Sequence, residues 1–417
     1  MDLTIEEVAS RINSSIKFVR KEVISGNLKS FKKRNRYYID EKEFNRWKEN
    51  ERRSSFDFDK MPSPKEDVVN WLDISKEMKS INAWKNKSDL SEFNFIDLFT
   101  GAGGLSCGLT MAGFRPVGSV EILESAVKTY RRNFSINKGF GETVESRDIR
   151  EESVKQALID KVKNKHIHLI AGGFPCQGFS MAGNRIVDDE RNSLYREMLN
   201  IVSSIKPDFV LMDNVEGLRS MLGGQVEQKI VSDYKEIGYE INVTVLNAAD
   251  YGVPQTRKRV IFIGNRIGLK NFHPKPILTP AKYKTVKDGI EKFLNIPEDK
   301  SINHEFTRHT KEMVERLAKI PEGQSLYANY SDAWKKVFWN KPSPTVKENH
   351  GGVNVHPILP RVMTPRELAA LQSFPDDFIF EGNKKWQLVQ IGNAVPPLLG
   401  KAIGLAIRKN LETGGKL

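Results

Sequence analysis

The chain contains few cysteines and no long apolar run. Two cysteines, Cys107 and Cys176, occur in 417 residues, which is too few for a disulfide framework or a cysteine-based metal cluster. No apolar run approaches the roughly 18 residues that a membrane helix needs. The first ten residues, MDLTIEEVAS, lack the apolar core of a signal peptide. These absences predict a protein of a reducing cytosol, with no bound metal and no membrane partner.

Acidic residues are in the minority. The sequence holds 65 Lys and Arg against 53 Asp and Glu, which gives a net charge of +12 and a pI near 9.4. This excess favours a polyanionic partner such as nucleic acid, although a basic chain can also be merely soluble.

The first 50 residues form a pattern of their own. Thr4 and Glu7 make a capping box before a first helix, and Ser15 caps a second helix. Residues 28–39 alternate apolar and basic side chains as a hairpin does, and Asp40 caps a third helix. This order resembles the winged helix-turn-helix of the excisionase and MerR-type DNA-binding family. The resemblance implies DNA contacts from the second helix and the hairpin; a module for protein contacts is the alternative. The residues concerned are Arg20, Lys21, Lys33 and Arg34.

The rest of the chain divides into regions that differ in the spacing of their apolar residues. Residues 51–92 are predicted to be a linker. Over 93–267, apolar strand-like runs are separated by helical patterns, which predicts an α/β fold with βαβ units and a parallel sheet. Residues 268–343 lose this rhythm, and helical patterns return within 344–417. The length also favours two or three domains, because single cores stop growing before this size.

A glycine-rich loop, TGAGGL at 100–105, follows the first of these strands. Its glycines allow backbone N–H groups to approach a ligand at the start of the next helix. Glu121 ends the next strand, where a carboxylate accepts hydrogen bonds from ribose hydroxyls. Ser106 replaces the last glycine of the dinucleotide fingerprint, and Asp97 would repel a pyrophosphate. A cationic nucleoside such as S-adenosylmethionine therefore fits better than NAD, with an ordinary tight turn as the alternative.

Cys176 lies in GGFPCQGFS, just beyond an apolar strand. That place is the carboxyl edge of the predicted sheet, where ligands bind in open α/β folds. Glycines and the polar residues Gln177 and Ser180 surround it. Cys107, by contrast, lies in an apolar helix and is predicted to be an ordinary buried cysteine.

An acid and two arginines follow the thiol. Asp213 ends another strand, and Arg257 and Arg259 open a further strand on one of its faces. A thiol, an acid and an arginine suit attack on a pyrimidine. The thiolate adds to carbon 6, while the acid at N3 and an arginine at O2 absorb the developing charge. Carbon 5 then accepts a methyl group from a sulfonium.

In this order, the motifs resemble those of the DNA (cytosine-5)-methyltransferases over residues 93–411. The matching stretches are DLFTGAGG, PCQGFS, RNSLY, QTRKR, TPRELAALQSFP and QIGNAVPP. The resemblance implies a Rossmann-like S-adenosylmethionine-dependent methyltransferase domain with a smaller target-recognition domain in 268–343, from which the chain returns to the catalytic domain in 344–417. It also implies a recognition site of about four to six base pairs, set by how many base edges such a surface reaches.

The resemblance also assigns residues. It implies duplex DNA with a flipped cytosine as partner, residues 177–193 as a loop that closes over the base, and a monomer in catalysis. The catalytic positions are Cys176, Asp213, Arg257, Arg259 and Gln177, and the loop's DNA contacts are Ser180 and Arg185. The positions that contact S-adenosylmethionine are Asp97, Phe99, Gly101, Gly103, Gly104, Leu105, Glu121, Ile122, Asp148, Ile149, Pro175, Leu194, Asn393 and Ala394.

Two positions depart from the family pattern. Asp213 stands where the family usually has Glu, and its side chain is one methylene shorter. The expectation is either that a small backbone shift lets Asp213 reach N3 or that the rate suffers. Ala370 stands where the family often has Arg, which puts one ion pair in doubt.

The predicted function is site-specific methylation of cytosine carbon 5 within a bacterial restriction-modification system, in the cytoplasm at the nucleoid. The N-terminal module is predicted to bind the enzyme's own promoter. One alternative is an RNA methylase of the same fold, but two cysteines leave no room for the extra Cys-Phe-Thr motif of the tRNA-acting branch. Another is a DNA-binding transcriptional regulator with a weakened methylase body, which the shortened acid supports.

Overall fold

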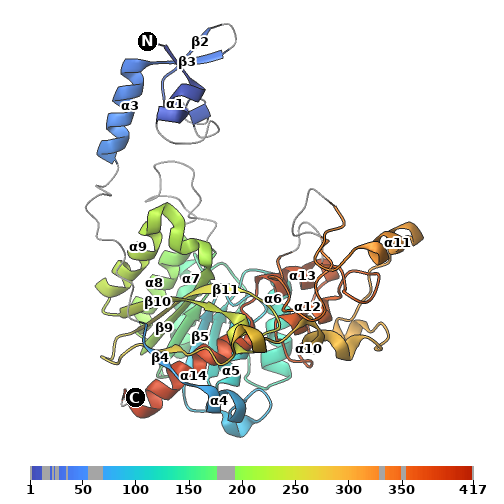
Figure 1. The fold of residues 1–417 in the computed structure, drawn as a ribbon. Helices are drawn as coiled ribbons and strands as arrows, with labels where there is room; N and C mark the ends of the chain where they lie inside the picture. The colour runs from blue at the N-terminus through green and yellow to red at the C-terminus, as the bar shows by residue number, and fades with distance from the viewer. Residues whose placement is uncertain are drawn as a thin grey trace. The chain divides into compact units, whose positions relative to one another are not determined.

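The computed structural model describes residues 2–11, 19–20, 23, 28–33, 36–54, 69–175, 193–327, 334–348 and 354–415 (Figure 1). The chain divides into two compact units, Met1–Asp67 and Val68–Leu417, and each is described by itself. None of the described helices combines the length and apolar character of a membrane span.

In the described part of the first unit, helices pack against a small sheet. Strands β1 (Asp2–Thr4), β3 (Arg36–Asp40) and β2 (Phe31–Lys33) lie in the order β1-β3-β2, all antiparallel. Helices α1 (Ile5–Arg11) and α3 (Glu41–Ser54) are the other regular elements among its described residues. The core of this unit gathers Leu3, Ile5, Val8, Ala9, Val19, Val23, Leu28, Ile39 and Phe44.

Local sequence signals explain how this unit is built. The predicted capping box forms: Thr4 Oγ1 accepts from the Glu7 N–H at 3.2 Å, and Glu7 Oε2 accepts from the Thr4 N–H at 2.8 Å. Asp40 accepts from the Lys42 N–H at 2.9 Å, at the start of α3. The predicted hairpin pairs β2 with β3. Ser15, the expected cap of the second helix, lies outside the described residues.

The second unit is built on a seven-stranded sheet in the order β10-β11-β9-β8-β5-β6-β7. The first five strands along the chain are parallel, as the alternation of strands and helices predicts. Their bounds are β5 Asn94–Leu98, β6 Arg115–Val120, β7 Val144–Glu145, β8 Leu169–Gly172 and β9 Phe209–Val215, followed by β10 Glu240–Asn247 and β11 Lys258–Asn265.

The parallel order of these strands ends at β11, which runs antiparallel to both β9 and β10. Ten residues, 248–257, separate β10 from β11. A connection of this length can join antiparallel neighbours, whereas a parallel pair needs a crossover of a dozen or more residues. The reversal has a consequence for the site. The beginning of β11 lies beside the end of β9, where Arg259 is paired with Val215.

Alternating side chains give the sheet two buried faces, each covered by helices. One face, with Ile96, Val210 and Phe262, packs against α7 (Glu152–Val162), α8 (Ser193–Ile205) and α9 (Gln225–Glu236). The other face packs against α5 (Gly104–Met111) and α14 (Pro397–Thr413). Glycines allow these two helices to approach closely, because a Cβ at Gly108 would lie 2.4 Å from the Pro397 carbonyl oxygen. The unit is therefore a three-layer sandwich (Figure 1).

Part of the segment 51–92, which was predicted to be a linker, belongs to folded elements. Helix α3 extends to Ser54, and the second unit begins at Val68. Strand β4 (Trp71–Leu72) pairs with β12 (His273–Pro274), and α4 (Ser75–Ser80) follows. Ile74 and Trp84 are buried in the cores of this unit. Scattered apolar residues that the sequence pattern assigned to a linker thus belong to the folded body.

The region predicted for target recognition forms short elements beside the sheet (Figure 1). These are α10 (Val286–Ile290) and α11 (Lys311–Lys319), with α6 (Glu124–Tyr130), α12 (Pro365–Leu371) and α13 (Lys384–Asn393) nearby in the same body. A shared apolar cluster joins residues of α6, α10 and α12, while a small separate cluster holds Leu317, Ile320 and Val355.

Candidate active site

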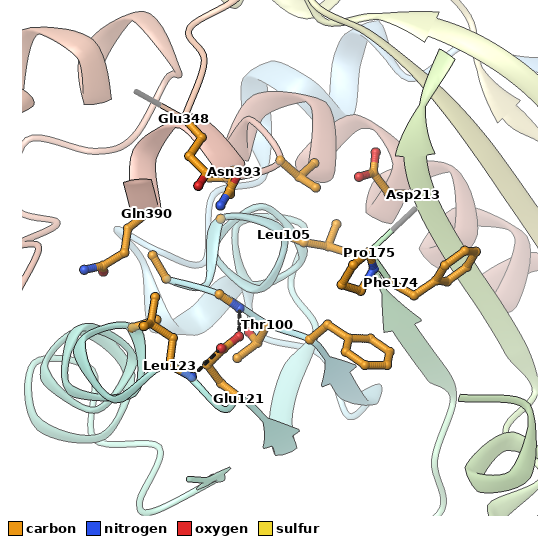
Figure 2. Close-up of a pocket in the computed structure, with 18 of the residues that line it drawn as sticks. Thr100, Leu105, Glu121, Leu123, Phe174, Pro175, Asp213, Glu348, Gln390 and Asn393 are labelled. Carbon is orange, nitrogen blue, oxygen red and sulfur yellow. Dashed lines mark hydrogen bonds between the residues drawn. The ribbon is translucent and has the colours of Figure 1, made fainter. Parts of the chain in front are cut away.

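A cavity of about 840 Å³ opens at the carboxyl ends of the parallel strands (Figure 2). The chain proceeds from β5 to β6 on one side and later resumes at β8 on the other, so β5 and β8 flank the point where the strand order reverses. Loops diverge at such a point and leave a crevice that binds ligands. The loops after β5 and β8 supply residues 99–102 and 173–175 to its wall.

The loop after β5 needs its glycines. Phe99 has φ 58°, a left-handed conformation that costs energy for a residue with a side chain and is found at functional sites. Gly101, with φ 54°, has no atom within 4 Å of where a Cβ would be and faces open space. Gly103 has φ 91°, and a Cβ there would lie 2.6 Å from the Phe134 ring. A Cβ on Gly104 would lie 2.4 Å from the Val395 carbonyl oxygen. The backbone is therefore exposed on one side and tightly packed on the other.

Glu121 fixes this loop to the end of β6. Its Oε2 accepts from the Gly101 N–H at 2.7 Å and its Oε1 accepts from the Leu123 N–H at 2.7 Å (Figure 2). Burial raises the pKa of Glu121, and the backbone hydrogen bonds from Leu123, Gly101 and Ile122 oppose that rise. The carboxylate lies in the cavity wall, where its remaining lone pairs can accept from a ribose.

Asp97 lies beneath the loop in a buried polar network. Its Oδ2 accepts from Ser106 Oγ at 2.6 Å and from Thr100 Oγ1 at 2.9 Å. Burial raises the pKa of Asp97 to about 7, against the hydrogen bonds from Ser106 and Thr100, and the charge of Glu121 adds to the rise. Ser106, the residue that departs from the dinucleotide fingerprint, thus supports the acid that gives this end of the cavity its negative character.

The far side of the cofactor end holds Ile122 and Asp148. Ile122 is 65% exposed, which is unusual for a large apolar side chain and leaves it free to pack on a flat ligand. Asp148 is bound by Arg150, whose Nη2 donates to Oδ2 at 2.6 Å. The hydrogen bond from the Arg150 side chain lowers the pKa of Asp148 despite some burial.

At the other end of the cavity, Asp213 and Arg259 form a buried ion pair. Arg259 Nε donates to Asp213 Oδ1 at 2.9 Å and Nη2 donates to Oδ2 at 2.5 Å, a bidentate geometry that fixes both side chains. Asn214 Nδ2 donates to the Phe174 carbonyl oxygen at 3.0 Å. This bond connects the end of β9 to the loop that leads, after Pro175, to Cys176.

Arg257 is oriented differently from Arg259, although both line the cavity on one face of the chain. Its Nη1 donates to the Val346 carbonyl oxygen at 2.9 Å and its Nη2 to the Gly392 carbonyl oxygen at 3.0 Å. Burial, together with the neighbouring positive charge of Arg259, lowers the pKa of Arg257 to about 9, and Asp213 acts in the opposite direction.

The structure brings most of the assigned residues together. Gly103 packs behind the cavity wall, while the other thirteen assigned cofactor residues line the cavity itself, as do Asp213, Arg257 and Arg259. Arg20 and Lys33 are exposed in the first unit. The residues Cys176, Gln177, Ser180, Arg185, Lys21 and Arg34 lie outside the described part of the chain. Cys107 is fully buried, as predicted, and burial raises the pKa of its thiol.

Sequence reasoning missed one wall of the cavity. Residues 345–348 and Gln390 line it, and Figure 2 shows Glu348 beside Asn393. Residues 345–348 follow directly on the region with no recognisable rhythm, so no motif marked them. Gln390 is the first residue of QIGNAVPP. Its place in the same motif as Asn393 is the signal that could have identified it.

The structure also answers the question raised by Ala370. This residue packs in an apolar cluster, and Glu367 forms its ion pair with Arg361 instead. Arg361 Nη1 and Nη2 donate to the two Glu367 carboxylate oxygens at 2.8 and 2.7 Å. The arginine comes from six residues upstream, so the buried acid keeps a partner without the expected Arg.

His166, His168 and Asp208 form a cluster at the opposite edge of the sheet whose ligand atoms lie within 4.8 Å of one another. The Asn94 N–H donates to His168 Nδ1 at 3.1 Å, so in the neutral ring the proton is on Nε2. A metal at that nitrogen would require removal of this proton. The other two side chains of the cluster, His166 and Asp208, are hydrogen-bonded to each other at 2.6 Å.

The sheet order, the glycine-rich loop and the carboxylate at the switch point define an α/β methyltransferase fold with a nucleoside cofactor site. Residues 93–409 match the family of C-5 cytosine-specific DNA methylases, and the chain belongs to this family. It is a DNA (cytosine-5-)-methyltransferase, and the enzymes of this family use S-adenosylmethionine as methyl donor.

Individual relatives each match about three quarters of the chain. It is 40% identical over 329 residues to the type II methyltransferase M1.HphI of Haemophilus parahaemolyticus, covering 76% of this chain and 86% of the relative. It is 34% identical over 373 residues to M.DdeI of Desulfomicrobium norvegicum, covering 74% and 87%. A crystal structure from E. coli, described as a prophage-encoded DNA modification methyltransferase, superposes with a TM-score of 0.63 at 29% identity, covering 77% of this chain and 99% of that one.

Proposed function

We propose that this enzyme methylates carbon 5 of one cytosine within a short duplex DNA sequence, as the modification enzyme of a bacterial type II restriction-modification system. The observation that carries this proposal is the shared cavity. A cofactor end with Glu121 and an acid–arginine end with Asp213 and Arg259 open into one space, at the start of the loop that leads to Cys176. The similarity to type II methyltransferases supports the restriction-modification setting.

The cofactor end fits S-adenosylmethionine by its chemistry. The Glu121 carboxylate is placed for the ribose hydroxyls, Ile122 offers an apolar face for adenine, and Asp148 offers an acceptor for its amino group. Buried acids under an open glycine turn suit a cationic sulfonium. When bound, the cofactor supplies an electrophilic methyl group, and the residues of the chain hold it in the direction of the base.

At the other end, the chain prepares the cytosine. We assign Cys176 as the nucleophile that bonds carbon 6, with Gln177 beside it in the same loop. In its protonated form Asp213 donates a hydrogen bond to N3, and Arg259, the second residue of β11, offers donors to O2. Charge on the ring is thereby stabilised while carbon 5 gains the methyl group. The carbon 5 proton then passes to solvent, and its electron pair restores the ring double bond as the bond between the sulfur and carbon 6 breaks.

Access to the base requires the cytosine to leave the duplex. We propose that residues 177–193, with Ser180 and Arg185, close over the flipped base. We assign target recognition to residues 268–343, which form short elements beside the sheet. One chain carries both ends of the cavity, so a monomer suffices for catalysis.

The first unit adds a separate role. We propose that it is a winged helix-turn-helix that binds the enzyme's own promoter through Arg20, Lys21, Lys33 and Arg34. Its α1, hairpin and α3 follow the predicted order, and Lys33 is exposed on β2. A regulator with a weakened methylase body is the second candidate, favoured by the shortened acid Asp213.

Methyl transfer from labelled S-adenosylmethionine to plasmid DNA tests the main proposal. Labelled 5-methylcytosine at one sequence context, lost in Cys176→Ser, is the expected result. Absence of transfer to any duplex, with binding to promoter DNA intact, would favour the regulator. A duplex with 5-fluorocytosine at the target should form a denaturant-stable complex through Cys176, because fluorine cannot leave as a proton does.

A further inference from the structure

One segment connects the predicted recognition region to the cofactor cavity. Residues 343–348, called the strap from here on, begin at the last residue of that region, and four of them line the cavity. Val346 is buried, whereas Lys347 is exposed. Figure 2 shows Glu348 at the cavity wall beside Asn393, in the stretch that closes the cofactor end.

Residues 254–257 hold the strap from Ser343 to Val346. The Ser343 N–H donates to the Pro254 carbonyl oxygen at 2.9 Å, and the Thr256 N–H donates to the Ser343 carbonyl oxygen at 2.9 Å. The Val346 N–H donates to Gln255 Oε1 at 2.8 Å. Arg257 adds one more hydrogen bond to the strap, because its Nη1 donates to the carbonyl oxygen of the same Val346.

The other end of the Arg257 guanidinium binds the opposite wall of the cavity. Its Nη2 donates to the Gly392 carbonyl oxygen, immediately before Asn393. The strap lies directly on this turn, since a Cβ on Gly392 would be 2.2 Å from the Glu348 nitrogen. Arg257 is 6% exposed, so its two charge-assisted bonds act with little competition from water.

We propose that Arg257 is a positioning residue of the cofactor pocket: it holds the strap and the Gly392 turn together, and so sets the shape of the wall that closes over the cofactor. Arg259, two residues on, faces Asp213 and serves the base. The two arginines of one short motif therefore act on different substrates. The guanidinium of Arg257 is committed to two main-chain carbonyl oxygens, which orients it toward the wall and away from the reacting ring.

Cofactor binding without DNA and steady-state kinetics together test this assignment in the full-length enzyme. Arg257→Lys keeps the charge but cannot reach two carbonyls in a fork. We expect its Kd and KM for S-adenosylmethionine to rise about tenfold or more, the size of one charge-assisted hydrogen bond, with kcat at saturating cofactor within about threefold of wild type. Arg259→Lys should show the opposite split. Arg266→Lys, an exposed arginine just beyond β11, is the matched control and should change neither quantity.

An unchanged cofactor affinity in Arg257→Lys, with a reduced kcat, would overturn the proposal and return Arg257 to the chemistry. If Arg257→Lys does not fold by circular dichroism, Thr345→Val provides the second test. This change removes the hydrogen bond from Thr345 Oγ1 to the Thr256 carbonyl oxygen, 2.9 Å long, and so weakens the attachment of the strap to residues 254–257. Its cofactor Kd should rise about threefold; a Kd equal to that of wild type would also overturn the proposal.

Discussion

The two ends of the cavity hold their carboxylates in different ways. At the base end, Asp213 is bound by the guanidinium of Arg259, which fixes its orientation by an ion pair. At the cofactor end, Glu121 and Asp97 are bound by neutral donors, two backbone N–H groups and two hydroxyls. Neutral donors leave these two carboxylates without a cationic partner, which suits a cationic ligand, whereas Asp148 on the far side is paired with Arg150. Chemistry and cofactor affinity should therefore respond to different mutations.

The largest effect is expected at the nucleophile. Cys176→Ser should reduce methyl transfer to background while cofactor Kd stays within a few-fold, because a serine hydroxyl is hardly ionised at neutral pH. Transfer of tritiated methyl groups and calorimetry of cofactor binding measure the two quantities. Substantial methylation by the Ser variant would exclude the covalent route.

The next effect concerns the acid of the base end. Asp213→Ala should lower kcat about 10²- to 10³-fold, as removal of one preorganised group at a developing charge does, with little change in cofactor affinity. Asp213→Glu restores the usual family acid and should keep or raise kcat if the shorter side chain is a handicap.

Glu216→Ala is the control for Asp213. Glu216 lies three residues away and approaches Lys258 at 3.4 Å on the surface. The Glu216→Ala variant should keep kcat within about twofold of the wild-type value, since exposed ion pairs contribute little. If Asp213→Ala proves as active as wild type while Glu216→Ala is not, the role belongs to Glu216.

At the cofactor end, Glu121→Gln should raise the Kd for S-adenosylmethionine about tenfold and leave kcat at saturation nearly unchanged. The amide loses the charge and one of the acceptor oxygens that hold the Gly101 and Leu123 N–H groups. Glu124→Gln, on the exposed start of α6, is the matched control. A fall in kcat without a change in Kd would mean that the two ends are not separable.

A smaller effect should appear in the pH dependence of stability. The pKa of Asp97 is about 7 in the folded protein against an ordinary value of 3.8, so between these values the folded state binds more protons than the unfolded state. Asp97 therefore makes the free energy of unfolding fall as pH rises from about 4 to 7. Asp97→Asn should flatten this dependence in urea titrations without cofactor, whereas Asp160→Asn, at an exposed helix position, should not. Equal slopes in wild type and Asp97→Asn would refute the assignment.

The smallest effect on methylation is expected from removal of the first unit. A chain that begins at Val68 keeps Ile74 and Trp84 in their cores and should methylate the same sequence with kcat/KM within a few-fold. Repression of a reporter from the native promoter should be lost. Repression that survives the truncation, or methylation that loses its sequence context, would contradict the proposed division of labour.

Local signals were sufficient for much of the fold. The capping box at Thr4, the strands at β5, β6, β8, β9 and β11 and the burial of Cys107 follow from side-chain periodicity and short-range hydrogen bonds. The reversal of β11 and the inclusion of residues 68–92 in the body were not predicted. Both depend on which distant partner a segment meets, β9 for the one and β12 for the other.

The class of reaction and most of the pocket could be predicted from the sequence, because the chemistry requires particular residues: glycines in a loop, a thiol after a strand, and an acid and an arginine at set places. The sequence also placed Arg257 and Arg259 on one face. Their separate roles depend on contacts that form only in the folded chain. The partners of Arg257 are main-chain carbonyls at Val346 and Gly392, 89 and 135 residues away, and a carbonyl group carries no mark in the sequence of the residue that bears it.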